Sequence, residues 1–176
     1  MLLSPIEQPP SLWMRIVYQL SERRFGKVLG VIKVIYARKP EIMPIALKIA
    51  RTMERLSLEP SLRFLVQVQT ARQNGCAFCE DLALAEAVRA RLGHEKFRAL
   101  PDYRTSPVFS ERERAALALA EEATQNRRLS PKTEAAVRAH FSEKEIIELT
   151  WLNAAENYYN LQAAVLGVES DELARR

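Results

Sequence analysis

Two serine–glutamate pairs in the C-terminal half of the chain constrain its fold more than any other local signal. Ser110 stands three residues before Glu113, and Ser142 stands three residues before Glu145. This spacing is typical of a capping box, which opens an α-helix. The chain has only five glycines, and no segment alternates apolar and polar residues between Gly or Asn turns, as a half-buried strand would. The sequence therefore predicts an all-α fold.

The remaining start and stop signals divide the 176 residues into about eight helices. We expect an N-terminal arm over residues 1–10, followed by a single helical domain over residues 11–176. Helix starts are expected at Ser11, near Glu41, at Pro60, after Asn74-Gly75, at Ser110, at Ser130-Pro131 and at Ser142. Residues 26–36 form a further apolar segment, and residues 98–107 are expected to form a loop. Gly93 and Gly167 are expected to end the fifth and the last helix.

The two cysteines of the chain, Cys76 and Cys79, lie together directly after the Asn74-Gly75 turn signal. A helical pattern follows, so the pair is expected to open a helix with its sulfurs about one turn apart, within disulfide reach. The partial positive charge of a helix N-terminus favours thiolate over thiol. A lone CxxC of this kind indicates dithiol/disulfide chemistry or half of a metal site.

Composition narrows these alternatives. Zinc sites need four ligands, and the only histidines, His94 and His140, are far apart in sequence, so we expect no metal and no cofactor. A net charge of +4 with no aromatic-and-basic platform predicts no nucleic-acid partner. No signal peptide and no apolar run of membrane-spanning length are visible, which predicts a cytoplasmic protein whose cysteines rest reduced.

The order of these signals resembles a known family. The residues that carry the likeness are Gln73-Asn74-Gly75-Cys76-Ala77-Phe78-Cys79 at a helix start and Asn153-Ala154-Ala155-Glu156-Asn157-Tyr158-Tyr159-Asn160 in a long terminal helix. This arrangement, over residues 25–168, resembles the AhpD-like (alkylhydroperoxidase D / carboxymuconolactone decarboxylase) family. The resemblance implies an AhpD-like helical domain, a homo-oligomer, a hydroperoxide or protein-disulfide substrate and a thiol reductant.

The resemblance also implies roles for the cysteines. In peroxide-reducing members the second cysteine attacks and the first resolves, so Cys79 would attack and Cys76 would resolve. Helix electrostatics alone favour Cys76, nearer the N-terminus, as the more ionised sulfur. The chain departs from the family at the proton relay, a glutamate twelve residues before the first cysteine and a histidine four after the second. Those positions hold Phe64 and Ala83.

Five other residues are candidates to support the pair. Glu80 and Asp81 could act as bases in place of the relay, although their charges would raise a thiol pKa. Arg72, one turn before Cys76, would lower it. Gln67 lies one turn along the same helix face as Phe64 and could hold a water near the sulfurs. Asn157, in a helically spaced asparagine set, belongs either to a structural network or to a pocket wall.

The leading hypothesis is a thiol-dependent oxidoreductase, with peroxidase activity or disulfide exchange. The alternative is a redox-responsive or structural oligomer that has lost the relay and does not turn over. A third function, cofactor-free lactone decarboxylation, leaves the cysteines idle and has no evident base. The apolar stripe with Trp13 and Ile16 is expected to pack in the domain or against a second subunit, with a membrane-surface helix as the other interpretation.

Overall fold

The computed structural model describes residues 1–93 and 95–175, and in this part of the chain all regular structure is helical. The α-helices are α1 (Leu12–Phe25), α2 (Met43–Glu54), α3 (Pro60–Gln73), α4 (Ala77–Arg89), α5 (Glu95–Ala99), α6 (Glu111–Asn126), α7 (Pro131–His140) and α8 (Glu143–Val165). A π-helical segment η1 (Ile32–Tyr36) and the 3-10 turns η2 (Pro40–Ile42), η3 (Leu100–Asp102) and η4 (Leu173–Arg175) complete the described elements. The predicted all-α fold is confirmed.

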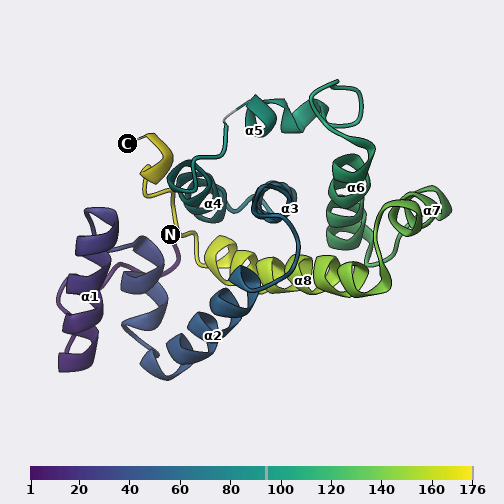
Figure 1. The fold of residues 1–176 in the computed structure, drawn as a ribbon. Coiled ribbons are helices and arrows are strands. Elements are labelled where there is room, and N and C mark those ends of the chain that lie inside the picture. The colour runs from purple at the N-terminus through teal and green to yellow at the C-terminus, as the bar shows by residue number, and fades with distance from the viewer. Residues whose placement is uncertain (94, 176) are drawn as a thin grey trace.

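Helix α3 lies at the centre of the domain. It packs against α4, α6 and α8, and α8 runs across the domain beneath it (Figure 1). Helices α1 and α2 lie on one side, and α7 lies on the other side beyond α6 (Figure 1). The side chains of Val66, Val68 and Ala71 on α3 are fully buried. The turn that leaves α3 is therefore anchored to a helix whose side chains are buried in the core.

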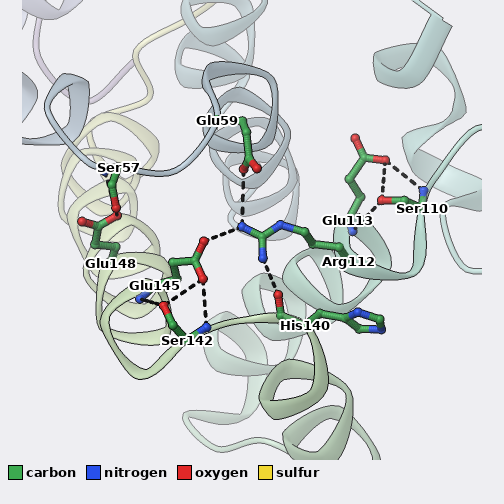
Figure 2. Close-up of polar contacts among 9 residues, drawn as sticks. All are labelled: Ser57, Glu59, Ser110, Arg112, Glu113, His140, Ser142, Glu145 and Glu148. Carbon is green, nitrogen blue, oxygen red and sulfur yellow. Dashed lines mark hydrogen bonds and ion pairs between the residues drawn. The ribbon is translucent and has the colours of Figure 1, made fainter.

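The predicted capping boxes are present. At the start of α6, Ser110 Oγ accepts the backbone N–H of Glu113 at 3.2 Å, and Glu113 Oε2 accepts the N–H of Ser110 at 2.9 Å. The same exchange occurs between Ser142 and Glu145 at the start of α8 (Figure 2). Each box satisfies two backbone donors that a helix terminus would otherwise leave unpaired.

Arg112 joins these two helix starts. Its guanidinium bonds Glu145 Oε1 at 2.6 Å and donates to the His140 carbonyl (Figure 2). It also lies 4.0 Å from the centre of the Phe141 ring. Glu59, at the start of α3, lies 3.5 Å away on the same guanidinium. One side chain thus links the starts of α3, α6 and α8 to the end of α7.

Two boundaries differ from the expectation. Helix α4 ends at Arg89 rather than at Gly93, because Arg91 itself adopts a left-handed conformation at φ 59° and the Leu92 N–H bonds the Ala87 carbonyl. Residues 98–107 are not simply a loop, since the end of α5 and the turn η3 lie within them. Leu100 is buried there and fixes this connection to the core.

Helix α1 packs in the domain through residues other than Trp13 and Ile16 of its apolar stripe. Trp13 and Ile16 are about half exposed, whereas Met14, Val17 and Tyr18 are buried. Packing of Trp13 and Ile16 inside the domain, one of the two expectations, is therefore wrong, and the expected contact with a second subunit stays a prediction. No helix in the described part of the chain is both long and apolar enough to cross a membrane.

Candidate functional site

The turn between α3 and α4 positions the cysteine pair. Gly75 adopts a left-handed conformation at φ 63°, which glycine tolerates without strain. Its N–H bonds the Arg72 carbonyl at 3.1 Å, and the Cys76 N–H bonds the Ala71 carbonyl at 2.9 Å. These two bonds form a Schellman motif, which ends α3 and fixes the direction in which the chain leaves it.

Cys76 also begins the next helix. Its side chain is the N-cap of α4, where Sγ accepts the backbone N–H of Cys79 at 3.3 Å. Cys76 and Cys79 are joined by a disulfide, with their Cα atoms 5.3 Å apart. The predicted CxxC at a helix N-terminus is therefore confirmed. One residue ends α3 with its backbone and begins α4 with its sulfur.

Both cysteines are buried, at 2% and 6% relative exposure. They belong to what we call the cysteine cluster, the buried apolar residues Met14, Val17, Tyr18, Val28, Leu29, Ile32, Val34, Ile35, Tyr36, Ala37, Met43, Ala46, Ala71, Cys76, Phe78, Cys79, Ala85, Ala163, Val168 and Leu173. Tyr159 packs against it from α8. The sulfurs thus lie between α4, the segment around η1 and the C-terminal half of α8.

The two positions of the family's relay lie in another cluster. Ala83 is part of the buried group Leu65, Val68, Ala83, Ala87, Phe97, Leu100, Tyr103, Phe109, Leu117 and Ala118, and Phe64 packs against that group. Hydrocarbon therefore occupies the places where the family pattern has a glutamate and a histidine. Because neither Phe64 nor Ala83 can exchange a proton, there is no proton relay at these two positions.

Amide side chains connect the cysteine turn to α8 instead. Asn74, two residues before Cys76, donates its Nδ2 hydrogens to Asn157 Oδ1 and Asn160 Oδ1, each at 3.0 Å. Asn153 donates to Thr70 Oγ1 on α3 at 2.9 Å. The asparagines of α8 thus form a buried hydrogen-bonded network, and Asn157 and Asn160 contact the turn that carries the cysteines.

Glu156 is a member of this network that the sequence analysis did not select. The residue is 5% exposed, and Asn160 Nδ2 donates to its Oε1 at 2.7 Å. Burial raises the pKa of Glu156 to about 7, against the lowering effect of hydrogen bonds from Asn160 and Gln67. Helical spacing could have identified it, because Glu156 shares a face with Asn153 and Asn160 on the buried side of α8.

The other predicted supporting residues have defined partners. Arg72 Nε bonds Glu80 Oε1 at 2.7 Å, so the cation expected to lower a thiol pKa is paired with a carboxylate expected to raise it. Asp81 accepts the N–H groups of Leu173 and Ala174, each at 2.9 Å, and fastens the C-terminal segment to α4.

Gln67 contributes to the α8 network, where its side chain bonds Glu156. His140 is exposed at the end of α7, and His94 lies outside the described residues. No group of three or more potential metal ligands occurs within residues 1–93 and 95–175. Asn157 therefore contacts the cysteine turn and Gln67 bonds Glu156. Glu80 is paired with Arg72, and Asp81 binds the C-terminal segment.

In this all-helical domain, a CxxC pair lies at the start of α4, directly after the central helix α3. This arrangement is that of an AhpD-like fold. Consistent with this class, residues 46–122 match the profile of the carboxymuconolactone decarboxylase family. An uncharacterised protein of Escherichia coli (strain K12), YnjA, is 32% identical over 161 residues, which cover 88% of this chain and 86% of the relative. The chain belongs to the carboxymuconolactone decarboxylase family.

Solved structures agree with this assignment. A protein of unknown function from Agrobacterium tumefaciens, provisionally designated an antioxidant defence protein AhpD, has a TM-score of 0.71 and 26% identity over 78% of this chain and 96% of that one. The debrominase Bmp8, crystallised as an alanine variant of a cysteine with a tribromopyrrole, has a TM-score of 0.83 and 18% identity, covering 99% of this chain and 94% of that one. The second likeness concerns the fold alone.

Proposed function

We propose that this protein is a thiol-dependent oxidoreductase in which Cys76 and Cys79 cycle between dithiol and disulfide. The observation that carries the proposal is the disulfide between two cysteines whose Cα atoms are 5.3 Å apart at the N-terminus of α4. The substrate is a hydroperoxide or a protein disulfide, and a thiol reductant restores the dithiol. Family membership supports a redox role for the pair.

With a hydroperoxide, the Cys79 thiolate attacks the terminal peroxide oxygen. A sulfur–oxygen bond forms, the oxygen–oxygen bond breaks, and an alcohol leaves after taking up a proton. The Cys76 thiolate then attacks the sulfur of the Cys79 sulfenic acid, so that the disulfide forms and water leaves. In total, two thiols and one hydroperoxide give one disulfide, one alcohol and one water.

The N-cap geometry supports the resolving role of Cys76. Its Sγ accepts the N–H of Cys79 at 3.3 Å, and a thiolate there would also experience the positive end of the α4 dipole. Both effects favour the ionised form that must attack the sulfenic acid. The attacking role of Cys79 rests on the family pattern.

The test is consumption of cumene hydroperoxide with dithiothreitol as reductant. We expect Cys79→Ser to abolish consumption. In a single turnover of reduced Cys76→Ser with dithiothreitol removed, we expect consumption to stop after one sulfenic acid per chain, which dimedone traps on Cys79. Asn126→Ala, at the exposed end of α6, is the control and should consume peroxide as the wild type does. Normal consumption by Cys79→Ser would refute the proposal.

A second candidate function is a redox-responsive oligomer without turnover. Phe64 and Ala83, in an apolar cluster where relay groups would be needed, favour it. This candidate predicts that oxidation changes the elution volume of the protein while peroxide is consumed only once per chain. Catalytic consumption with a reductant would eliminate it.

The oligomer itself and the compartment are also proposals. The exposed apolar stripe on α1, formed by Leu12, Trp13, Ile16 and Leu20, is the surface we assign to a subunit contact in a homo-oligomer. A protein that cycles with a thiol reductant is expected to work in the reducing cytoplasm. Light scattering of Trp13→Glu against the wild type tests the contact: a lower mass is expected.

A further inference from the structure

Glu156 is a buried carboxyl without a cation. Within the described residues no lysine, arginine or histidine forms an ion pair with it. Its hydrogen-bond partners are the amides of Asn160 and Gln67. A charged carboxylate is costly in such an environment, whereas a carboxylic acid that can release and take back a proton is not.

The hydrogen-bond partners of Glu156 connect it to the turn that carries the cysteines. Asn160 accepts a hydrogen bond from Asn74 at 3.0 Å, and Asn74 lies in the turn directly before Cys76. Ala163 is on the same face of α8 two turns beyond Glu156, a rise of about 10 Å, and it packs in the cysteine cluster. Glu156 therefore lies on the face of α8 that contacts the cysteine turn through Asn160 and the cysteine cluster through Ala163.

We propose that Glu156 is the proton-exchanging group of the Cys76–Cys79 pair, in place of the relay that Phe64 and Ala83 cannot form. This inference rests on the proposed function, because it assigns a residue to that reaction. It places the acid on α8, on the polar side of the cysteine turn, rather than on α3 and α4. The ligand class it serves is a hydroperoxide.

The proton transfers of this reaction balance without a further reactant. When the Cys79 thiolate attacks the peroxide, the departing alkoxide takes the proton of the Glu156 acid and leaves as an alcohol. The Glu156 carboxylate then accepts the thiol proton of Cys76, which frees that sulfur to displace hydroxide from the Cys79 sulfenic acid. The hydroxide takes the proton back from Glu156 and leaves as water, and solvent reprotonates the carboxylate.

Few titratable groups face this acid. Tyr159 lies on the same helix, and the charge of Glu156 contributes to raising the pKa of the Tyr159 phenol. Tyr36 of η1 contributes to the same rise. Burial raises the pKa of Tyr36 to about 12, so both phenols are neutral at physiological pH. A thiolate on the pair would raise the pKa of Glu156 further and keep it protonated when the proton is needed.

The first test separates proton transfer from thiolate formation. Oxidation by cumene hydroperoxide needs a proton for the leaving alkoxide, whereas alkylation by iodoacetamide needs only a thiolate. We expect Glu156→Gln to slow oxidation of reduced protein by about 100-fold while alkylation changes little. In the wild type, the ratio of oxidation to alkylation should fall as pH rises through neutrality, and in Glu156→Gln it should be flat.

Two variants provide controls. Glu156→Asp keeps a carboxyl and should restore most of the oxidation rate. Glu113→Gln removes a similarly buried carboxyl that is paired with Lys96 and lies at the start of α6, so it should leave the pH dependence of the ratio unchanged. Wild-type oxidation and an unchanged ratio in Glu156→Gln would overturn the assignment and leave the cysteine chemistry intact.

The second test needs no peroxide turnover. Infrared difference spectra between the dithiol and disulfide states of the wild type at neutral pH should show the carbonyl band of a carboxylic acid growing on reduction. The band should be absent from the same spectrum of Glu156→Gln. No acid band on reduction would overturn the assignment even if the pair proves inactive toward peroxides. Failure of the proposed function alone would appear as an acid band without fast oxidation.

Discussion

The starts of α4, α6 and α8 use one geometry for two purposes. At α6 and α8, the serine oxygen accepts the N–H of the third helical residue, and the glutamate there accepts the serine N–H. At α4, Cys76 Sγ accepts the N–H of Cys79 in the same way. The return bond is missing, because the Cys76 N–H already bonds the Ala71 carbonyl that ends α3.

This difference shows why a cysteine can occupy the third helical position of α4. In a capping box that position must supply an acceptor for the N-cap N–H. The Schellman motif at Gly75 satisfies this donor with backbone alone, and the side chain at position 79 is free to be a sulfur. The capping boxes stabilise helix ends, whereas the α4 start holds two reactive side chains and depends on buried tertiary contacts.

The largest expected effect comes from removing one of those contacts. Asn160 is fully buried and bonds both Asn74 and Glu156. Asn160→Ala strands these polar groups, so we expect the free energy of unfolding of the reduced protein to fall by about 3 kcal/mol in a urea titration. The exposed Asn126→Ala should change it by less than about 0.5 kcal/mol. Equal losses in the two variants would mean that the α4 start does not depend on the network.

Glu156 in the α8 network and Glu145 in the capping box of α8 should change the free energy of unfolding with pH in opposite directions. Burial raises the folded-state pKa of Glu156 to about 7, so its contribution weakens as pH rises from about 4.5 to 7. The Ser142 backbone, Arg112 and the Ser142 hydroxyl lower the folded-state pKa of Glu145 to about 2, so its contribution is present above 4.5 and is lost as pH falls toward 2.

Denaturation of the wild type, Glu156→Gln and Glu145→Gln across pH 2 to 8 would show this difference. The wild type should lose roughly 2 kcal/mol relative to Glu156→Gln between about pH 4.5 and pH 7. Relative to Glu145→Gln, it should lose stability only on the acid side. If Glu156 and Glu145 changed the free energy of unfolding with pH in the same direction, the contrast between the α8 network and the capping box would be contradicted.

Cys76→Ser tests whether burial or capping dominates at α4. Serine is the better N-cap, but the hydroxyl would enter the cysteine cluster, where Cys76 is 2% exposed. We expect the reduced variant to lose about 1.5 kcal/mol relative to the reduced wild type, because burial of the hydroxyl outweighs the improved cap. A gain in stability would show that this helix start behaves like the other two.

The reciprocal change, Ser142→Cys, should have the smallest effect. Sulfur is a weak acceptor, so the Glu145 N–H loses most of its cap while the exposed position imposes no burial cost. Under reducing conditions we expect a loss of about 1 kcal/mol in the free energy of unfolding. An unchanged value would mean that the Ser142 hydroxyl contributes nothing as a cap.

Local signals predicted the helix starts well. The Ser–Glu pairs, Pro60 and the Asn74-Gly75 turn each satisfy or remove backbone donors within a few residues, so their geometry is encoded locally. The end of α4 was placed wrongly, because Arg91 takes the left-handed conformation that glycine usually supplies. The sequence left open whether the apolar stripe of α1 packs in the domain or against a second subunit, since which apolar face is covered depends on tertiary packing.

The candidate site was predictable in part. Cys76 and Cys79 follow from their spacing, and the loss of the relay follows from Phe64 and Ala83. The pairing of Arg72 with Glu80, and the use of Asp81 by the C-terminal segment, depend on contacts across the fold. Glu156 is 80 residues from Cys76 in sequence, and only the packing of α8 against α3 brings it to the turn.

The most direct test of the account is the rate at which reduced protein forms the Cys76–Cys79 disulfide with one equivalent of hydroperoxide at neutral pH, followed by intact mass. The reference is a peptide of residues 73–81, which has the same CxxC without the fold. We predict that the folded protein reacts far faster, because the α4 terminus and its buried network activate the thiols. A rate equal to that of the peptide would contradict the account and leave a redox-responsive or structural role.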